Sequence, residues 1–316
     1  MPDIQSAVRT ALVDCMEIKR GEDVLVVTDP AKRAIAEAIV SMARELGAEV
    51  VLMEMSERES HGSEPPRPVA AAMLECDALI APTSKSISHT EARKAACDNG
   101  ARAATMPDIT EEMLVRTMSA DYKAVKRRSD AIAKLLTDGK EVHISSSQGT
   151  DVIFSIEGRD GLSDDGRLAE PGTFGNLPAG EGFIAPVEGR TNGRLVFDGS
   201  VWPLGRLKDP LTVDIKDGYA RSFSGPAGER FRSILDGHGT EAFAVAELGI
   251  GTNEAAILTG NVLEDEKIIG TIHVAFGDNH SFGGTIRVSS HQDGIVLEPT
   301  VDIDGTRLLE DGRLLL

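Results

Sequence analysis

Residues 23–53 read DVLVVTDPAKRAIAEAIVSMARELGAEVVLM, and this stretch decides the fold of the first half of the chain. Its two ends, residues 23–27 and 49–53, are short apolar runs, which is typical of buried strands. Between them, residues 31–46 place apolar side chains at helical spacing, after a helix-starting proline and before Gly47, a residue type that ends helices. A strand, a helix and a second strand in this order predict a parallel β-sheet covered by helices.

The same alternation continues beyond this stretch. Further strands are expected at residues 77–81 and 101–106, with a helix before each of them and a helical pair at about 109–137. Residues 1–137 are therefore predicted to form an α/β domain with a parallel sheet. This half carries neither the GxGxxG motif after its first strand nor a P-loop motif, so a nucleotide site is unsupported.

The composition and pattern of the sequence change at about residue 138. From there Gly, Asp, Asn and Ser punctuate short β-prone runs, such as IVLEPTVDI at residues 295–303. One helix is expected at about 226–236, and residues 171–189 are expected to form a Gly- and Pro-rich loop of the kind that often serves function. Residues 138–316 therefore predict a second, β-rich α+β domain.

The composition excludes several classes of function. The 316 residues carry a formal net charge of −18, whereas nucleic-acid binding depends on clustered Lys and Arg. No apolar run approaches the roughly 20 residues that span a bilayer, and the N-terminus lacks the pattern of a signal peptide. The three cysteines are scattered, without a CxxC pair or a disulfide framework. We therefore expect a cytoplasmic protein that binds neither nucleic acid nor membrane.

Acidic and imidazole side chains gather between residues 247 and 293. His291 and Asp293 are two residues apart, and on a strand such residues point to the same face, so both could reach one ion. Glu247 follows Ala-Val-Ala and precedes Leu-Gly-Ile-Gly, and a carboxylate in so apolar a setting is costly to bury unless it is paired or bound to a metal. Each feature also has a simpler interpretation, as surface residues of a strand or as a helix-capping acid.

Glu266 and His273 extend this group. His273 lies in the β-like run TIHVAFG, where Thr271 and Ala275 would share its face and leave space around the ring, although a core histidine without a ligand is the alternative. Imidazole and carboxylate are the ligands of zinc, manganese, cobalt and ferrous iron. Together these features predict a catalytic metal centre of one or two ions that activates water, carried by the second domain, with Glu266 as bridging ligand or general base.

Four ordered motifs resemble the aminopeptidase T / aminopeptidase S family of metallopeptidases. They are NLPAGE with APVEGRTNG (Asn176 to Gly193), AELGIGTN, DEKIIGTIHVAFG and HQD. The resemblance implies a hydrolase, a metal-dependent aminopeptidase that acts in proteolysis on small peptides, with a zinc, cobalt or manganese centre, and a homodimer or other homo-oligomer. In this interpretation the loop that begins at Asn176 shapes the substrate pocket, and Glu181 meets the free amine. The implied metal ligands are Glu247, Glu266, His273, His291 and Asp293.

A ring-cleaving enzyme of related fold, 2,5-dihydroxypyridine 5,6-dioxygenase, is the alternative. It resembles the chain at the AELG-like and HxD positions, but it uses ferrous iron held by two histidines and one carboxylate. That triad needs a histidine where Glu247 stands, and the enzyme lacks an equivalent of His273, so both residues favour the hydrolase. The stretch between the AELG motif and the acidic–His motif is also shorter here than in the aminopeptidases. Only Glu254 and Glu264 supply acids in that interval. A non-catalytic binding protein that keeps the fold is the third hypothesis.

Overall fold

The computed structural model describes residues 3–316, and the chain divides into two compact units. Unit 1 comprises the residues up to 123 and residues 166–179, whereas unit 2 comprises residues 124–165 and 180–316. This division differs from the expected one at residues 137/138. Helix α6 (Tyr122–Asp138) belongs almost wholly to unit 2, and a later segment returns to unit 1 to complete its sheet.

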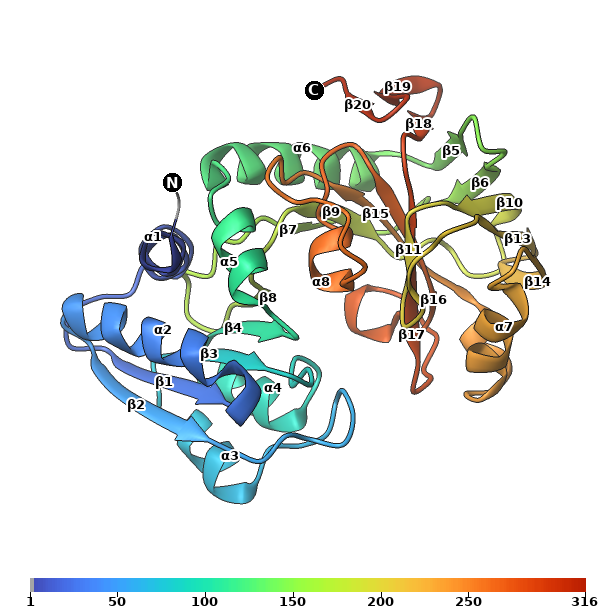
Figure 1. Cartoon of the computed structure of the whole chain (residues 1–316). Helices are drawn as coiled ribbons and strands as arrows, with labels where there is room; N and C mark the ends of the chain where they lie inside the picture. The colour runs from blue at the N-terminus through green and yellow to red at the C-terminus, as the bar shows by residue number, and fades with distance from the viewer. Residues whose placement is uncertain (1–2) are drawn as a thin grey trace. The chain divides into compact units, whose positions relative to one another are not determined.

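Unit 1 contains a five-stranded sheet in the order β2-β1-β3-β4-β8, and every neighbouring pair in it is parallel. Its strands are β1 (Asp23–Thr28), β2 (Glu49–Glu54), β3 (Ala78–Thr83), β4 (Arg102–Pro107) and β8 (Phe174–Asn176). Its helices are α1 (Ile4–Arg9), η1 (Thr10–Cys15), η2 (Pro30–Lys32), α2 (Arg33–Glu45), α3 (Arg67–Met73), α4 (Glu91–Asp98) and α5 (Glu111–Thr117). Helices α2 and α3 lie on opposite faces of the sheet (Figure 1). The expected α/β architecture with a parallel sheet is confirmed.

The strand–helix–strand element at residues 23–53 follows from its sequence. Residues 24–27 of β1 are all buried, as a strand covered on both faces requires. Asp29 accepts a hydrogen bond of 3.1 Å from the backbone N–H of Ala31 and so caps the short helix that leads into α2. Along α2, buried apolar side chains recur every three or four residues and form the stripe that packs on the sheet.

Unit 2 contains two sheets in which neighbouring strands are antiparallel (Figure 1). The eight-stranded sheet consists, in spatial order, of β14 (Tyr219–Ser224), β13 (Leu211–Lys216), β10 (Asn192–Phe197), β6 (Asp151–Ser155), β5 (Glu141–Ser145), β18 (Thr300–Ile303), β19 (Thr306–Glu310) and β20 (Arg313–Leu314). The seven-stranded sheet consists of β12 (Gly205–Arg206), β11 (Ser200–Val201), β17 (His291–Val296), β16 (Ile272–Gly277), β15 (Val245–Gly251), β9 (Glu181–Ile184) and β7 (Leu162–Asp164). Besides α6, the helices of unit 2 are α7 (Gly228–Asp236), η3 (Thr240–Phe243), α8 (Val262–Asp265) and η4 (His280–Phe282). The expected β-rich second domain with a helix near residues 226–236 is confirmed.

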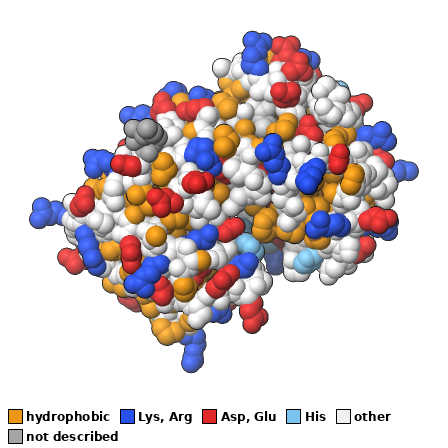
Figure 2. Space-filling model, viewed as in Figure 1, with side chains coloured by type: hydrophobic (Ala, Val, Ile, Leu, Met, Phe, Trp, Pro, Cys, Tyr) orange, Lys and Arg blue, Asp and Glu red, His pale blue; other side chains and the backbone are white. Residues whose placement is uncertain are grey.

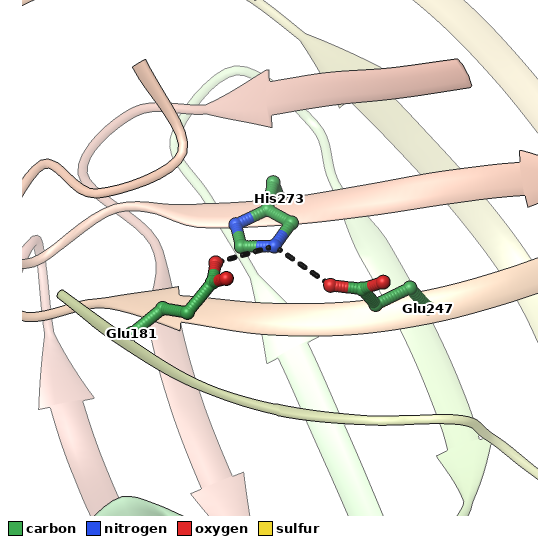
Figure 3. Close-up of side chains that lie close together, drawn as sticks. All are labelled: Glu181, Glu247 and His273. Carbon is green, nitrogen blue, oxygen red and sulfur yellow. Dashed lines mark hydrogen bonds and ion pairs between the residues drawn. The ribbon is translucent and has the colours of Figure 1, made fainter. Parts of the chain in front are cut away.

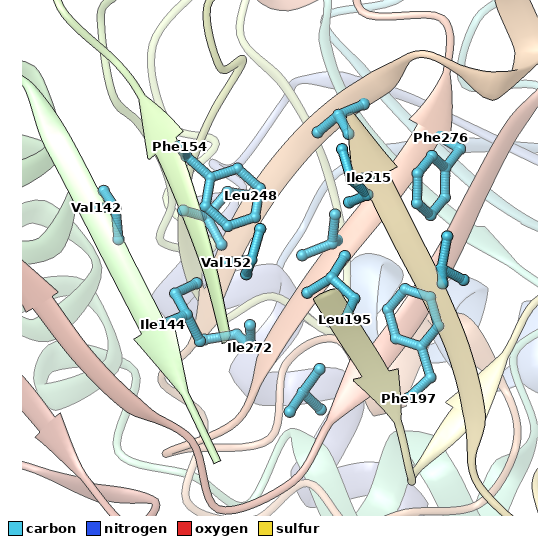
Figure 4. Close-up of a cluster of buried hydrophobic side chains, with 14 of the residues drawn as sticks. Val142, Ile144, Val152, Phe154, Leu195, Phe197, Ile215, Leu248, Ile272 and Phe276 are labelled. Atoms are coloured by element: carbon cyan, nitrogen blue, oxygen red, sulfur yellow. The ribbon is translucent and has the colours of Figure 1, made fainter. Parts of the chain in front are cut away.

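One apolar core joins the two sheets of unit 2 (Figure 4). Phe197 on β10 and Phe276 on β16 are fully buried, and their ring centroids lie 6.4 Å apart in an edge-to-face arrangement. Phe231 of α7 makes a similar contact with Phe276 at 6.1 Å. Because one face of the seven-stranded sheet is held by this core, its other face can carry polar groups.

The loop expected at residues 171–189 is only partly irregular. The structure places β8 and β9 within it, in different sheets, and buries Leu177 and Ile184 completely. The expectation of a continuous loop was wrong, because strands of three or four residues are too short to show an alternating pattern among so many glycines and prolines.

Among residues 3–316, no helix is both long enough and apolar enough to cross a bilayer. On the face of the molecule that Figure 2 shows, Lys and Arg side chains are interspersed with Asp and Glu. Charges of both signs are therefore mixed on this face.

Candidate metal centre

Four neighbouring strands, β9, β15, β16 and β17, bring the acidic and imidazole side chains together. Because side chains alternate along a strand, each strand has one face toward the core and one away from it. Leu248 and Val274 belong to the core face. On the opposite face, Ala275 of β16 pairs with Glu247 on one side and with Asp293 on the other. The small alanine thus leaves space between two carboxylates from the flanking strands.

A glycine of β15 makes room for the imidazole of His273. Gly249 is the register partner of His273. A Cβ atom added at Gly249 would lie 2.1 Å from both Cε1 and Nε2 of that ring, far inside van der Waals contact. The ring therefore lies directly over the backbone of β15, and only glycine at position 249 permits this approach.

His273 is fully buried, and its Nε2 lies between two carboxylates (Figure 3). Glu181 Oε2 is 3.1 Å away and Glu247 Oε1 is 3.2 Å away. Burial lowers the pKa of His273, but Glu181 and Glu247 together raise it well above its ordinary value. In the metal-free protein this imidazole therefore holds a proton, and a metal ion must displace that proton to bind.

His291 contacts Glu247 through the other oxygen of that carboxylate. Its Nε2 lies 3.4 Å from Glu247 Oε2 and 3.5 Å from Asp293 Oδ1. Burial lowers the pKa of His291, but Asp293 and Glu247 raise it well above its ordinary value. Its Nδ1 lies 2.7 Å from the carbonyl oxygen of Asp278, and because a carbonyl only accepts, Nδ1 donates this hydrogen bond. The bond fixes the ring and leaves Nε2 to face the acids, as in metal-binding histidines.

Glu266 and Lys267 follow α8 and complete the acidic cluster. Lys267 Nζ lies 2.9 Å from Glu266 Oε1 and 2.6 Å from Glu181 Oε1. Burial, assisted by Glu181 and Asp293, raises the pKa of Glu266 to about 8 against the effect of Lys267. Burial also raises the pKa of Glu181, but Lys267 and His273 outweigh it and lower this pKa to about 2. At neutral pH the metal-free protein therefore holds a proton on Glu266 and a negative charge on Glu181.

The five predicted metal ligands all lie in unit 2, and the structure brings them into one cluster. Within it, two groups of three residues have donor atoms within 4.8 Å of one another: Glu181, Glu247 and His273, and Glu266, His273 and Asp293. His291 belongs to neither group but contacts two of their acids. Glu181, expected to meet a substrate amine, lies 3.1 Å from His273 Nε2.

Asn176, the other residue predicted to bind substrate, belongs to unit 1. It ends β8, and its Oδ1 accepts hydrogen bonds from Thr105 Oγ1 (2.7 Å) and Ser88 Oγ (3.3 Å). Within unit 1 these contacts fix the amide at the carboxyl ends of β4 and β8, an edge at which parallel sheets often bind ligands.

Two residues of the cluster were not predicted from the sequence. Lys267 stands in the charged run Asp-Glu-Lys, which resembles an exposed turn, yet its side chain is 1% exposed. Asp164 lies 3.1 Å from its ammonium group. The only sequence signal for Lys267 is that it directly follows a predicted ligand, Glu266.

The cluster fits a divalent metal ion. Two donors that are each about 2.1 Å from a cation and at right angles to one another lie about 3.0 Å apart. The imidazole-to-carboxylate separations here are 3.1, 3.2, 3.4 and 3.5 Å. Glu181 Oε2 is buried, and its partner in the metal-free protein is the imidazole of His273 at 3.1 Å. A cation that displaces the imidazole proton would take that proton's place between Glu181, Glu247 and His273.

Comparison with known proteins identifies the family. The family model for NicX, 2,5-dihydroxypyridine 5,6-dioxygenase, matches residues 3–316. The curated 2,5-dihydroxypyridine 5,6-dioxygenase of Pseudomonas putida KT2440 is 24% identical over 196 residues, which are 58% of this chain and 55% of the relative. The matched region thus spans about half the length of that relative.

Two solved structures share the fold. The structure of 2,5-dihydroxypyridine dioxygenase from Pseudomonas putida KT2440 has a TM-score of 0.85 at 18% identity and covers 98% of this chain and 96% of its own. AmpT from Thermus thermophilus has a TM-score of 0.72 at 18% identity and covers 99% of both chains. At such low identity these similarities describe the fold alone.

The interpretation as a hydrolase, an aminopeptidase or metalloprotease active in proteolysis, is wrong. The likeness to aminopeptidases is supported by structure alone, whereas the family model and the curated relative are both dioxygenases. Glu247 and His273 favoured the hydrolase, but carboxylate and imidazole serve many divalent metals and do not distinguish the two reactions. The chain belongs to the 2,5-dihydroxypyridine 5,6-dioxygenase family.

Proposed function

We propose that the protein is a non-haem ferrous-iron dioxygenase that opens the ring of a dihydroxylated nitrogen heterocycle of the 2,5-dihydroxypyridine type. Membership of the family supports the reaction class. The observation that carries the proposal is that Glu247 faces two imidazoles, with Oε1 3.2 Å from His273 Nε2 and Oε2 3.4 Å from His291 Nε2. Two histidines and one carboxylate with open positions are the donor set of non-haem ferrous oxygenases.

In this proposal the iron ligands are His273 and Glu247, whose donor atoms lie in one group, together with His291, which contacts Glu247 from outside that group. A histidine at position 247 was the expected requirement for a ferrous triad, and its absence argued against this chemistry. The imidazole of His273 on the neighbouring strand supplies the second nitrogen instead, at a site prepared by Gly249. In this proposal the second imidazole donor is kept, but it comes from position 273 and not from position 247.

Ferrous iron held by these residues would supply the redox chemistry that activates dioxygen. The residues of the chain orient the ligands and manage protons. The carbonyl of Asp278 keeps the His291 ring in place. Glu266 pairs with Lys267 and has a donor oxygen within 4.8 Å of donor atoms of His273 and Asp293, a position that suits transfer of a proton to or from a ring hydroxyl. Burial of His273 and Glu247 keeps bulk water from the reacting groups.

The test is oxygen consumption by protein loaded anaerobically with ferrous iron and supplied with 2,5-dihydroxypyridine. We expect uptake that chelation abolishes and that His291→Ala reduces at least about 100-fold. His143→Ala is the matched control, because this histidine lies on the eight-stranded sheet with its side chain 42% exposed and forms an ion pair with Asp151. Absence of uptake across a panel of dihydroxylated pyridines would refute the proposed reaction.

A further inference from the structure

Lys267 places an ammonium group among the acids of the metal centre. Its side chain is 1% exposed, and Nζ lies 2.6 Å from Glu181 Oε1, 2.9 Å from Glu266 Oε1 and 3.1 Å from Asp164 Oδ2. A buried cation so enclosed by carboxylates has the surroundings of a bound metal ion. The reaction proposed above assigns this lysine no part.

The backbone and the sheet hold this arrangement in place. The N–H of Lys267 donates to the carbonyl of Glu264 (3.0 Å), and its own carbonyl accepts from the N–H of Asn253 (2.9 Å). Asp164 of β7 and Glu181 of β9 are register partners, so both acids are fixed by strand pairing. The ammonium group thus joins segments that are far apart in the sequence.

The possible metal ligands overlap in a way that favours a single ion. The two groups of donor atoms share His273, and a neutral imidazole offers only one nitrogen lone pair to a cation. Each group also includes one acid that is bound to Lys267, Glu181 in the first and Glu266 in the second. A second metal ion among these oxygens would lie close to the ammonium group, and like charges at such distances repel strongly in a buried site.

We propose that the ammonium group of Lys267 takes the place of a second metal ion, so that the centre holds one divalent cation. Lys267 is then a positioning residue, which holds Glu181 and Glu266 and leaves positions around the single ion for substrate. The inference rests on the proposed function for the identity of the resident ion.

The test is a count of Mn²⁺ ions, by equilibrium titration and by electron paramagnetic resonance, in wild type, Lys267→Gln and Lys140→Gln. Lys140 is the control, because its side chain is 70% exposed and pairs with Glu157 at the surface. We expect one isolated Mn²⁺ per chain in wild type and control. Lys267→Gln is expected to bind a second ion, which would give a spin-coupled pair.

Two ions per wild-type chain would overturn the inference, as would a single ion in folded Lys267→Gln. If that variant does not fold, Lys267→Gln combined with Asp164→Asn removes a negative charge together with the positive one, and the same two counts apply. No ring substrate enters this measurement. One ion per chain without oxygen uptake would therefore refute the proposed reaction alone, and two ions with oxygen uptake would refute the role of Lys267 alone.

Discussion

Replacing Gly249 with alanine is predicted to weaken metal binding although Gly249 is not a ligand. The new Cβ would lie 2.1 Å from Cε1 and Nε2 of His273, whereas ordinary contacts lie at 3.4–4 Å. The ring must therefore shift by more than about 1 Å, roughly half of a metal–nitrogen bond of about 2.1 Å. Because ligands must be held to within about 0.5 Å, His273 would be lost from the coordination sphere. We expect the affinity to fall about 100-fold, which corresponds to about 2.7 kcal/mol.

The assay is equilibrium titration with Mn²⁺, accompanied by urea unfolding of the metal-free proteins. Overpacking is expected to cost the free energy of unfolding about 1–3 kcal/mol, and the variant should remain folded. Gly237→Ala is the matched control, since Gly237 is exposed at the end of α7 and its Cβ would meet only backbone oxygens, the nearest at 3.2 Å. Wild-type affinity in folded Gly249→Ala would refute the assignment of His273 as a ligand.

The remaining predictions concern a ligand, a proton and the core. His291→Ala should lower the Mn²⁺ affinity at least about 100-fold, and undiminished affinity would exclude His291 as a ligand. The pKa of Glu266 is raised from 4.5 to about 8, so the folded protein binds this proton more tightly than the unfolded chain. The free energy of unfolding of chelated protein should therefore fall as the pH rises between these values, and Glu266→Gln should flatten that slope in urea titrations; an equal slope in both proteins would contradict the assignment. Phe276→Ala should cost about 3–5 kcal/mol in urea unfolding, far more than Ile153→Ala at a site that is 42% exposed, and equal losses would contradict the core described here.

The sequence predicted those parts of the site that depend on local geometry. His291 and Asp293 share a strand face because the period of two is a property of the strand itself. Glu181 could not be predicted beside His273, because their contact requires β9 to pair with β15 and β15 with β16, and such pairings join distant segments. The burial of Lys267 likewise depends on acids from β7 and β9.

The fold class followed from the sequence more readily than the chemistry. The alternation in residues 23–53 is long and periodic, so it predicted the parallel sheet of unit 1. The reaction did not follow, because Glu247 and His273 are compatible with hydrolytic and oxygen-activating metals alike. The resemblance of the motifs to aminopeptidases led to the prediction of a peptidase. The match of the dioxygenase family model over residues 3–316 corrected that prediction.

The most direct test of the proposed function uses isotopically labelled dioxygen. Ferrous protein is incubated with 2,5-dihydroxypyridine under ¹⁸O₂, and the product is examined by mass spectrometry. We predict a ring-opened product that contains both atoms of the labelled dioxygen, with no such product from His291→Ala. An unchanged ring, or oxygen incorporated from solvent water alone, would contradict a dioxygenase centre built on His273, His291 and Glu247.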